Sequence, residues 1–312
     1  MTRDVAQPQR SRVYLNPFLC SDYWALYRPR DDDIVIASAY KAGTTWMQTI
    51  VANLIFADGQ FPSAVMEMSP WIDRYRPDDG IAAIMAQIER QTHRRFLKTH
   101  LPLDALHFLP QVKYLFLARD PRDIFMSLWN HHCNYSDKTL TQISRASTEL
   151  GQPWPKIPSD INEFWRLWMT RAWFEWESEG YPYWSVLHNV ASWWPYRHLP
   201  NVLFVHYNDL LADTPRRIQS IARFLDFELS PQQVSEIAAR VTLAQMKQNA
   251  SQVMGIFASG FKGGGNTFIN KGTNGRWRGV LSERDLELYD AALARNLDAP
   301  AARWSAHGGD IA

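Results

Sequence analysis

Short apolar runs that are each followed by an amphipathic segment constrain the fold of this chain more than any other feature. A run bounded by polar residues is typical of a strand buried on both faces, whereas apolar residues at three- and four-residue spacing indicate a helix. Strands that alternate with helices predict an α/β fold of three layers, with a central, mostly parallel sheet and helices on both faces. The runs are residues 34–38, 95–98, 113–118 and 202–205, and the helical segments are 44–56, 121–131 and 215–225.

The length and composition are those of one globular domain. Of the 312 residues, 46% are hydrophobic and 21% are charged, which allows a large buried core. We expect a single domain over residues 1–312, with its core at about 34–296 and flexible ends at 1–12 and 298–312. The formal net charge of +1 gives no overall attraction to nucleic acid, so an anion site must be built locally.

Cysteine content and hydropathy indicate a cytoplasmic protein. The two cysteines, Cys20 and Cys133, are too few for a disulfide framework, which favours a reducing compartment. The first residues contain no apolar segment of the kind found in a signal peptide. No apolar run approaches the ~20 residues that span a bilayer, so we expect no stable insertion into a membrane.

The loop between the first predicted strand and its helix has the features of a phosphate site. It reads Tyr40-Lys41-Ala42-Gly43-Thr44-Thr45-Trp46. Free N–H groups and the dipole at a helix start attract a phosphate, Gly43 permits a close approach of the backbone, and Lys41 adds a positive charge. The lysine precedes the glycine, whereas in a Walker A motif it follows it. The alternative is a capped helix start that carries an exposed lysine.

Four sequence blocks resemble, in order, the motifs of the cytosolic sulfotransferase family that uses 3′-phosphoadenosine-5′-phosphosulfate (PAPS). The first block, residues 39–46, resembles Y-P-K-S-G-T-T-W, with Tyr40 in place of the proline and Ala42 in place of the serine. The second, K-T-H-L-P, is intact at residues 98–102. Because the four blocks keep their order and spacing over residues 34–290, the resemblance is more specific than any block by itself.

The third and fourth blocks carry the residues that the family uses for the 3′-phosphate of its donor. Arg119 begins the third block, and Ser127 follows eight residues later. The fourth block, R-K-G-x-x-G-D-W in the family, reads N-K-G-T-N-G-R-W at residues 270–277, so Asn270 stands where the family has an arginine. We therefore expect affinity for the 3′-phosphate to depend more on Arg119 and Lys271 than is usual.

By this resemblance the protein has a P-loop NTPase-like sulfotransferase fold and moves the sulfuryl group of PAPS to a hydroxyl of a small acceptor, releasing 3′-phosphoadenosine 5′-phosphate (PAP). His100 is the implied general base, because an ordinary histidine pKa of about 6.5 leaves the imidazole neutral at neutral pH. Lys41 neutralises the charge that grows on the bridging oxygen. Ser127 holds Lys41 away from that oxygen until the acceptor binds, and Lys98 contacts the sulfuryl oxygens or the acceptor. No metal is required.

The donor site that the resemblance implies draws on distant parts of the chain. Trp46 and Tyr207 border the adenine, and Leu243 stands where the family often has an aromatic residue, which predicts weaker stacking. Phe268 packs near the ribose or base, with a plain core position as the alternative. The residues expected to bind the donor are Lys41, Ala42, Gly43, Thr44, Thr45, Trp46, Arg119, Ser127, Tyr207, Thr242, Leu243, Phe268, Asn270, Lys271 and Gly272.

Irregular segments rich in proline or glycine are expected to cover the site, and the last of them to be mobile. They are residues 58–79, 134–159 and 251–265. Trp71, Tyr135 and Trp154 lie in the first two segments and are the expected contacts of an aromatic or lipophilic acceptor.

A helix expected at residues 161–179 is also rich in aromatic residues, but their three- and four-residue spacing favours the core. The positions concerned are Phe164, Trp165, Trp168, Ala172 and Trp173. The dimer motif of the family, K-x-x-x-T-V-x-x-x-E, is matched only loosely at residues 278–287. We therefore expect a monomer or a weak dimer.

Other interpretations remain open at this point. Arg119 could pair structurally with Asp120 or Asp123 instead of binding a phosphate. The protein could be a metal-dependent nucleotide or nucleoside kinase, or a nucleotide-binding protein without catalysis. We predict no metal site, because the adjacent His131 and His132 point in different directions on a helix and the other histidines lack partners at ligand spacing.

Overall fold

A four-stranded parallel sheet forms the centre of the computed structural model, which describes residues 7–77 and 80–311. The strand order within this part of the chain is β2-β1-β3-β4, and each neighbouring pair runs parallel. The strands are β1 (Ile34–Ser38), β2 (Phe96–Thr99), β3 (Lys113–Ala118) and β4 (Val202–His206). The predicted parallel sheet is therefore confirmed.

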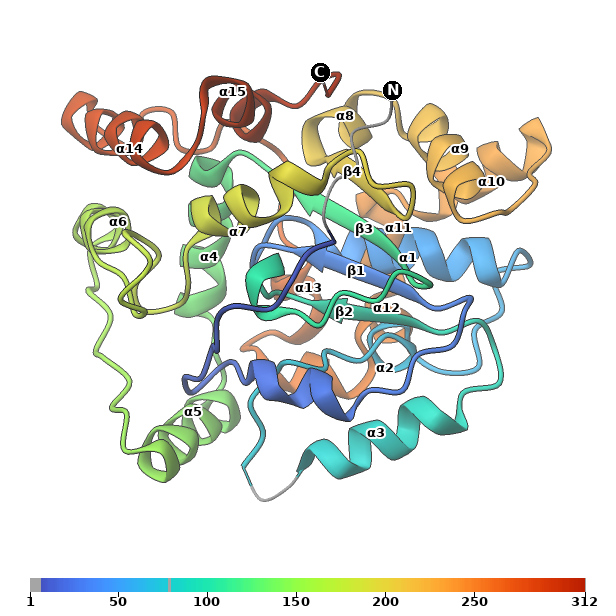
Figure 1. Ribbon diagram of the computed structural model, residues 1–312, viewed down its shortest axis with the longest axis horizontal. Helices are drawn as coiled ribbons and strands as arrows, with labels where there is room; N and C mark the ends of the chain where they lie inside the picture. The colour runs from blue at the N-terminus through green and yellow to red at the C-terminus, as the bar shows by residue number, and fades with distance from the viewer. Residues whose placement is uncertain (1–6, 78–79, 312) are drawn as a thin grey trace.

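Helices surround the sheet (Figure 1). Those predicted from apolar spacing are confirmed as α1, α4 and α9, while α8, directly after β4, was not predicted. The helices are α1 (Thr44–Ile55), α2 (Val65–Met68), α3 (Gly80–Arg90), α4 (Pro121–Cys133), α5 (Asp137–Leu150), α6 (Ile161–Thr170), α7 (Val186–Trp193), α8 (Tyr207–Ala212), α9 (Thr214–Phe224), α10 (Pro231–Arg240), α11 (Leu243–Gln248), α12 (Ala250–Met254), α13 (Gly264–Phe268), α14 (Glu283–Asn296) and α15 (Ala299–His307), with 3-10 turns η1 (Ser21–Leu26), η2 (Leu103–Ala105), η3 (Trp194–Tyr196) and η4 (Gly255–Gly260).

Side chains of the strands alternate between two apolar cores, as the pleat of a strand requires. In β1, Ile34 and Ile36 face a core built with α1, α9 and α10. Val35 and Ala37 face the opposite core, to which α4, α6, α7, α14 and α15 contribute (Figure 1). Because helices bury both faces, the strands need no polar face, and the three-layer prediction is confirmed.

The carboxyl ends of the four strands meet at one edge of the sheet. The register pairs Ala37 of β1 with Thr99 of β2, and Ala118 of β3 with His206 of β4. The residues that directly follow the strands therefore come together at this edge, the usual place for ligands in an open α/β sheet.

The segment 134–159, expected to be irregular, contains the four-turn helix α5, so that prediction was wrong. Ser136 caps its start by accepting a hydrogen bond from Thr139 N, and Gly151 ends it with a φ of 62°. The buried Ile143 lies on its inner face. The three prolines that suggested a loop all lie beyond the end of this helix.

The other two expected covering segments are also more regular than predicted. Residues 58–77 include the short α2, whereas residues 78–79, also part of the first segment, lie outside the described residues. Residues 251–265 are mostly short helical turns, namely most of α12, all of η4 and the start of α13. Their glycines lie at the boundaries of these turns, at the ends of η4 and at the start of α13, rather than forming one long loop.

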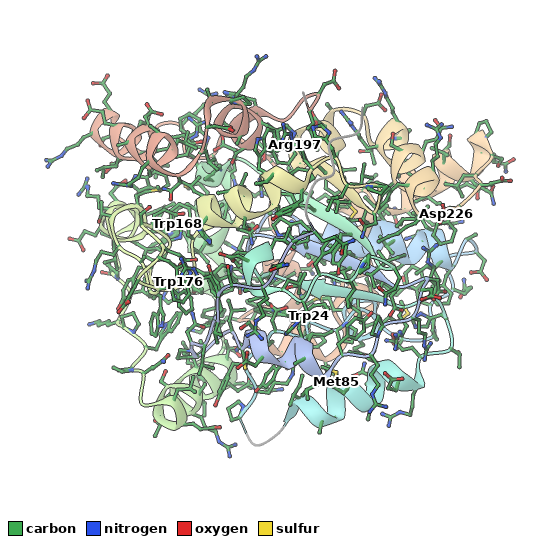
Figure 2. All side chains as sticks on the ribbon, viewed as in Figure 1. Trp24, Met85, Trp168, Trp176, Arg197 and Asp226 are labelled. Atoms are coloured by element: carbon green, nitrogen blue, oxygen red, sulfur yellow. The ribbon has the colours of Figure 1, made fainter. Side chains whose placement is uncertain are left out.

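The aromatic segment after residue 154 serves mainly as core, as predicted. The helix ends at Thr170 instead of continuing to residue 179, and Trp165 and Trp168 within it are 0% and 1% exposed. Figure 2 shows Trp168 and Trp176 on the same flank of the molecule. Trp176 follows the helix and donates its indole N–H to Tyr14 Oη at 2.8 Å.

Within the described residues, both end segments contact the rest of the fold. Residues 298–312 were predicted to be flexible, but α15 lies there and buries Trp304 against Phe204 of β4, with ring centroids 5.2 Å apart. At the other end, residues 1–6 lie outside the described part, while the N–H groups of Ser11 and Arg12 donate to Asp104 O. Over residues 7–77 and 80–311, no helix combines the length and apolar character needed to cross a membrane.

Candidate active site

A cavity of about 1190 Å³ lies at the carboxyl edge of the sheet. It is lined by residues that follow β1, β3 and β4, by Lys98 within β2 and by the segment after Ile269. Of the predicted site residues, Ala42 and His100 do not line it. The following do: Lys41, Gly43, Thr44, Thr45, Trp46, Lys98, Arg119, Ser127, Tyr207, Thr242, Leu243, Phe268, Asn270, Lys271 and Gly272.

The β1–α1 loop has an unusual backbone that exposes the start of α1. Lys41 adopts a left-handed φ of 67° and Gly43 a φ of 111°. A Cβ atom at Gly43 would lie 2.7 Å from Tyr207 Cδ2, so only glycine fits there. The N–H groups of Gly43, Thr44 and Thr45 find no acceptor within the described residues, and such N–H groups at a helix start form an anion site.

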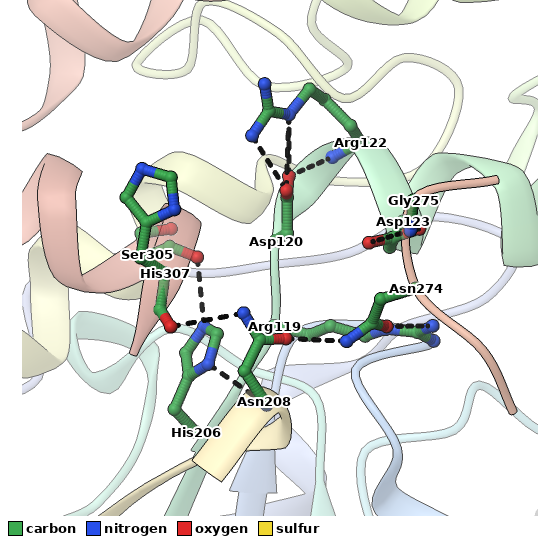
Figure 3. A network of polar contacts seen from close by, with 10 residues as sticks. All are labelled: Arg119, Asp120, Arg122, Asp123, His206, Asn208, Asn274, Gly275, Ser305 and His307. Carbon is green, nitrogen blue, oxygen red and sulfur yellow. Dashed lines mark hydrogen bonds and ion pairs between the residues drawn. The ribbon is translucent and has the colours of Figure 1, made fainter. Parts of the chain in front are cut away.

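Arg119 is held at the cavity wall by neutral partners (Figure 3). Its Nε and Nη2 donate to Asn274 Oδ1 at 3.0 and 2.7 Å, and its guanidinium lies 4.2 Å from the ring centre of Tyr207. Asp120 instead pairs with Arg122, and Asp123 accepts from Gly275 N. The structural pairing of Arg119 with either aspartate, left open by the sequence, is therefore not formed.

Arg276 is a cavity residue that the sequence argument did not assign. It occupies the position where the fourth motif of the family has an aspartate, and it lines the cavity. Its Nε atom is buried without a hydrogen-bond partner among the described residues. Burial and then the nearby charge of Arg119 lower the pKa of Arg276. Two differences from the family motif could have pointed to Arg276. Asparagine stands at 270 where the family has an arginine, and arginine stands at 276 where the family has an aspartate.

His100 lies just behind the cavity wall, 3% exposed. Its Nδ1 is 3.0 Å from Ser38 O, and because a carbonyl only accepts, Nδ1 carries the proton and Nε2 keeps its lone pair. Tyr40 and Trp71, which line the cavity, pack edge-on against the imidazole at centroid distances of 5.3 and 4.8 Å. Burial and then the charge of Lys98 place the pKa of His100 well below its ordinary value, so the ring is neutral.

Lys41 is held by His131, not by the predicted Ser127. Lys41 Nζ lies 3.1 Å from His131 Nδ1, and His131 Nε2 lies 2.6 Å from Tyr40 Oη. His131 is one turn beyond Ser127 on α4 and so shares its face, a spacing that could have identified it. Burial, followed by the charges of Lys98 and Arg119, lowers the pKa of Lys41 to about 7.

Phe268 is a wall of the cavity rather than a plain core residue, because Lys41 Nζ lies 4.3 Å from its ring centre. Lys98 also lines the cavity, with Nζ 5.4 Å from the ring centre of Trp71. Burial lowers the pKa of Lys98 to about 8, against the opposing effect of Asp73. Two lysines with lowered pKa values thus occupy this part of the cavity.

Trp71 and Tyr135 line the cavity, as expected for acceptor contacts, but Trp154 does not. Trp154 stacks on Trp173 at a centroid distance of 5.7 Å and packs against Phe18 at 4.7 Å. The prediction for Trp154 was wrong because a partner distant in the sequence covers its ring.

The predicted adenine residues gather at one end of the cavity. The rings of Trp46 and Tyr207 are 5.3 Å apart, and Tyr207 Oη donates to Gly272 O at 3.0 Å. A Cβ atom on Gly272, whose φ is 65°, would meet Leu243 Cδ2 at 3.0 Å. The loop that begins at Asn270 therefore closes against the segment that contains Thr242. Among the described residues, no group of three or more His, Cys, Asp or Glu side chains could hold a metal ion.

Comparison with known proteins identifies the family. The sulfotransferase domain model matches residues 31–299. A glycolipid sulfotransferase of Mycobacterium bovis is 28% identical over 90% of both chains, and Sulfotransferase 1A1 of Rattus norvegicus is 26% identical over 85% of this chain and 84% of its own. Retinol dehydratase in complex with androsterone and the inactive cofactor PAP has a TM-score of 0.69 at 24% identity, covering 90% of this chain and 87% of its own, which supports the same fold. The chain therefore belongs to the sulfotransferase domain family.

Proposed function

We propose that this protein transfers the sulfuryl group of PAPS to a hydroxyl of a small aromatic or lipophilic acceptor and releases PAP. The observation that carries the proposal is one cavity bordered by two anion sites, the free N–H groups at the start of α1 and the guanidinium of Arg119. Lys41 lies near both, since it belongs to the loop that leads into α1 and the charge of Arg119 influences its pKa. The 5′ end of the donor binds at the helix start and its 3′-phosphate at Arg119 and Ser127.

In the transfer step, the acceptor hydroxyl gives its proton to His100 Nε2 and its oxygen forms a bond to sulfur. The bond between sulfur and the bridging oxygen breaks in line, and its electron pair stays on the phosphate oxygen of PAP. Lys41 neutralises this growing charge, assisted by the N–H groups of Thr44 and Thr45. Tyr40 and Trp71 define the approach to His100, because their rings pack directly against it.

An aromatic or lipophilic acceptor fits the remaining wall of the cavity. That wall includes the rings of Phe18, Trp71, Tyr135 and Phe261. Among similar proteins, one is named a glycolipid sulfotransferase and another was solved with androsterone, which supports an acceptor with a large apolar part. Aromatic walls favour such ligands through burial of apolar area.

Incubation with PAPS and a panel of phenols and lipophilic alcohols tests the proposal. We expect time-dependent release of PAP that requires both substrates. Thermal-shift assays with PAP and with ATP–Mg²⁺ distinguish a sulfotransferase from a kinase. A kinase predicts that ATP–Mg²⁺ raises the melting temperature of the protein more than PAP does. Binding of PAP without turnover on any acceptor would favour a nucleotide-binding protein instead.

Replacement of Arg119 by glutamine should lower the affinity for PAP at least about tenfold, because a hydrogen bond to a charged group is lost. We expect Arg276→Gln to act in the same direction, since Arg276 adds a second charge next to Arg119. Titration calorimetry measures both, with adenosine 5′-phosphate, which lacks the 3′-phosphate, as the control ligand. An equal loss for both ligands would contradict the assignment of Arg119 to the 3′-phosphate.

A further inference from the structure

The cavity carries more positive charge than the proposed donor contacts use. Nine lysine and arginine side chains line it, against a single carboxylate, Glu67, among the described residues. The whole chain has a formal net charge of only +1, so positive charge is concentrated here. Lys41, Lys98, Arg119, Lys271 and Arg276 belong to the donor end, and the others are Arg74, Arg76, Lys138 and Arg145.

Two cations outside the donor end have protein partners that explain their positions. Arg76 donates to the carbonyl groups of Trp71, Ile72 and Arg74 at 2.6 to 3.1 Å. Lys138 Nζ donates to Ser259 Oγ at 3.1 Å. These side chains fasten neighbouring segments to one another.

Arg74 differs, because its guanidinium has no hydrogen bond or ion pair within residues 7–77 and 80–311, and its Nη1 atom is buried without a partner. It lies 4.3 Å from the ring centre of Phe18 and 5.6 Å from that of Trp71. Aromatic faces offset part of the charge of a cation, but they do not accept its N–H groups. A buried donor without an acceptor is costly unless a ligand completes it.

The neighbouring carboxylate is not free to pair with Arg74. Asp73 Oδ1 accepts from Trp24 Nε1 at 3.0 Å, and Oδ2 accepts from Trp71 Nε1 at 2.7 Å and from His100 N at 3.1 Å. These bonds direct Asp73 away from the cavity, which it does not line. Within the described part of the chain, the positive charge of Arg74 therefore has no carboxylate to compensate it on the acceptor side.

The tyrosines whose charge would act on Arg74 stay neutral as well. Tyr40, Tyr135 and Tyr183 all interact with its charge, yet burial keeps the pKa of each well above the ordinary tyrosine range. They are linked to one another, with Tyr135 Oη 3.4 Å from Tyr40 Oη and 3.3 Å from Tyr183 Oη. A phenolate counter-ion for Arg74 is thus excluded at neutral pH.

We propose that Arg74 binds a carboxylate of the acceptor, so that the preferred acceptor is an aromatic hydroxy acid. This inference rests on the proposed function and adds the acceptor class to it. The planar guanidinium presents a fork that matches a carboxylate, and Phe18 and Trp71 beside it provide faces for the ring that carries the acid. Arg74 is thereby a specificity-determining residue.

The test compares acids with their methyl esters. The acceptors are 4-hydroxybenzoate, 4-hydroxyphenylacetate and 4-hydroxycinnamate, which place the carboxylate at increasing distances from the phenol. For at least one pair, we expect the wild type to favour the acid by about tenfold or more in kcat/KM. Arg74→Gln should abolish this preference mainly through KM, because the carboxylate contact exists in both the ground and the transition state. Arg74→Lys should keep part of it.

Controls separate this inference from the proposed function. Arg223→Gln removes one exposed positive charge on α9, outside the cavity, and should leave the acid preference unchanged. Calorimetry of the wild-type complex with PAP, titrated with each acid and ester, gives a readout that needs no turnover. Ester binding equal to or tighter than acid binding for all three pairs overturns the role of Arg74, even if sulfuryl transfer to neutral phenols is observed. Retained acid preference in Arg74→Gln also overturns it.

Discussion

Replacement of His100 by glutamine is expected to lower the turnover of sulfuryl transfer by about 10²–10⁴-fold while PAP affinity stays nearly unchanged. The reason is the position of the ring, whose Nδ1 donates to Ser38 O at 3.0 Å and leaves Nε2 as the proton acceptor. A glutamine amide can keep a hydrogen bond to that carbonyl but has no basic nitrogen. Single-turnover kinetics with saturating PAPS, together with PAP calorimetry, measure the two effects.

A matched histidine variant controls this experiment. His93→Gln changes a partly buried histidine outside the cavity and should retain normal turnover. A residual rate for His100→Gln above about one hundredth of the wild type would argue against a general base. A larger loss in His131→Gln than in His100→Gln would transfer the role to His131, which lines the cavity directly.

Replacement of Lys41 by methionine should lower turnover by about 10²–10³-fold, because a charge aimed at the leaving oxygen is lost. The same variant should remove a pH dependence of PAP binding. In the free protein the pKa of Lys41 is about 7, and an anionic ligand favours the charged form, so it raises that pKa. Below pH 7 the lysine is already charged and contributes no pH dependence.

Above pH 7, binding of PAP must therefore take up a proton, and affinity should fall as the pH rises from 7 to 9. Calorimetry in buffers of different ionisation enthalpy counts this proton directly. Lys98, whose pKa is about 8, adds to the effect, so the decisive quantity is the difference between the wild type and Lys41→Met. Lys156→Met, at an exposed position outside the cavity, serves as the control. A wild-type affinity that is constant over this range would contradict the role of Lys41.

The contact of His131 with Lys41 could not be predicted from sequence motifs. The sequence indicated a helix after Arg119, and that helix is confirmed as α4. Ser127, which the family resemblance assigned to the donor site, lines the cavity. The contact between Lys41 and His131, however, depends on the direction of two side chains that are 90 residues apart in the chain. Short motifs do not encode such a direction.

The altered fourth block is a second case in which the motif does not give the position of a side chain. Both changes from the family motif, at Asn270 and Arg276, are visible in the sequence, but the position of Arg276 at the cavity wall is not. Arg119 meets Asn274 across 155 residues, and Asn274 Nδ2 in turn donates to Asn208 Oδ1, which helps to fix the loop (Figure 3). In this docked loop, Arg276 lines the cavity.

By itself, the sequence determined the strands, three of the helices beside them and the order of the four motif blocks. These features depend on local hydrophobic periodicity and on residues close together in the chain, which a single sequence displays directly. The tertiary structure decided which side chains meet: His131 with Lys41, Arg276 near Arg119, and His100 behind Tyr40 and Trp71. It also left Arg74 without a counter-ion among the residues that the structure describes. Burial, pKa and hydrogen-bond partners arise from contacts between distant segments, and those contacts exist only once the layers have packed.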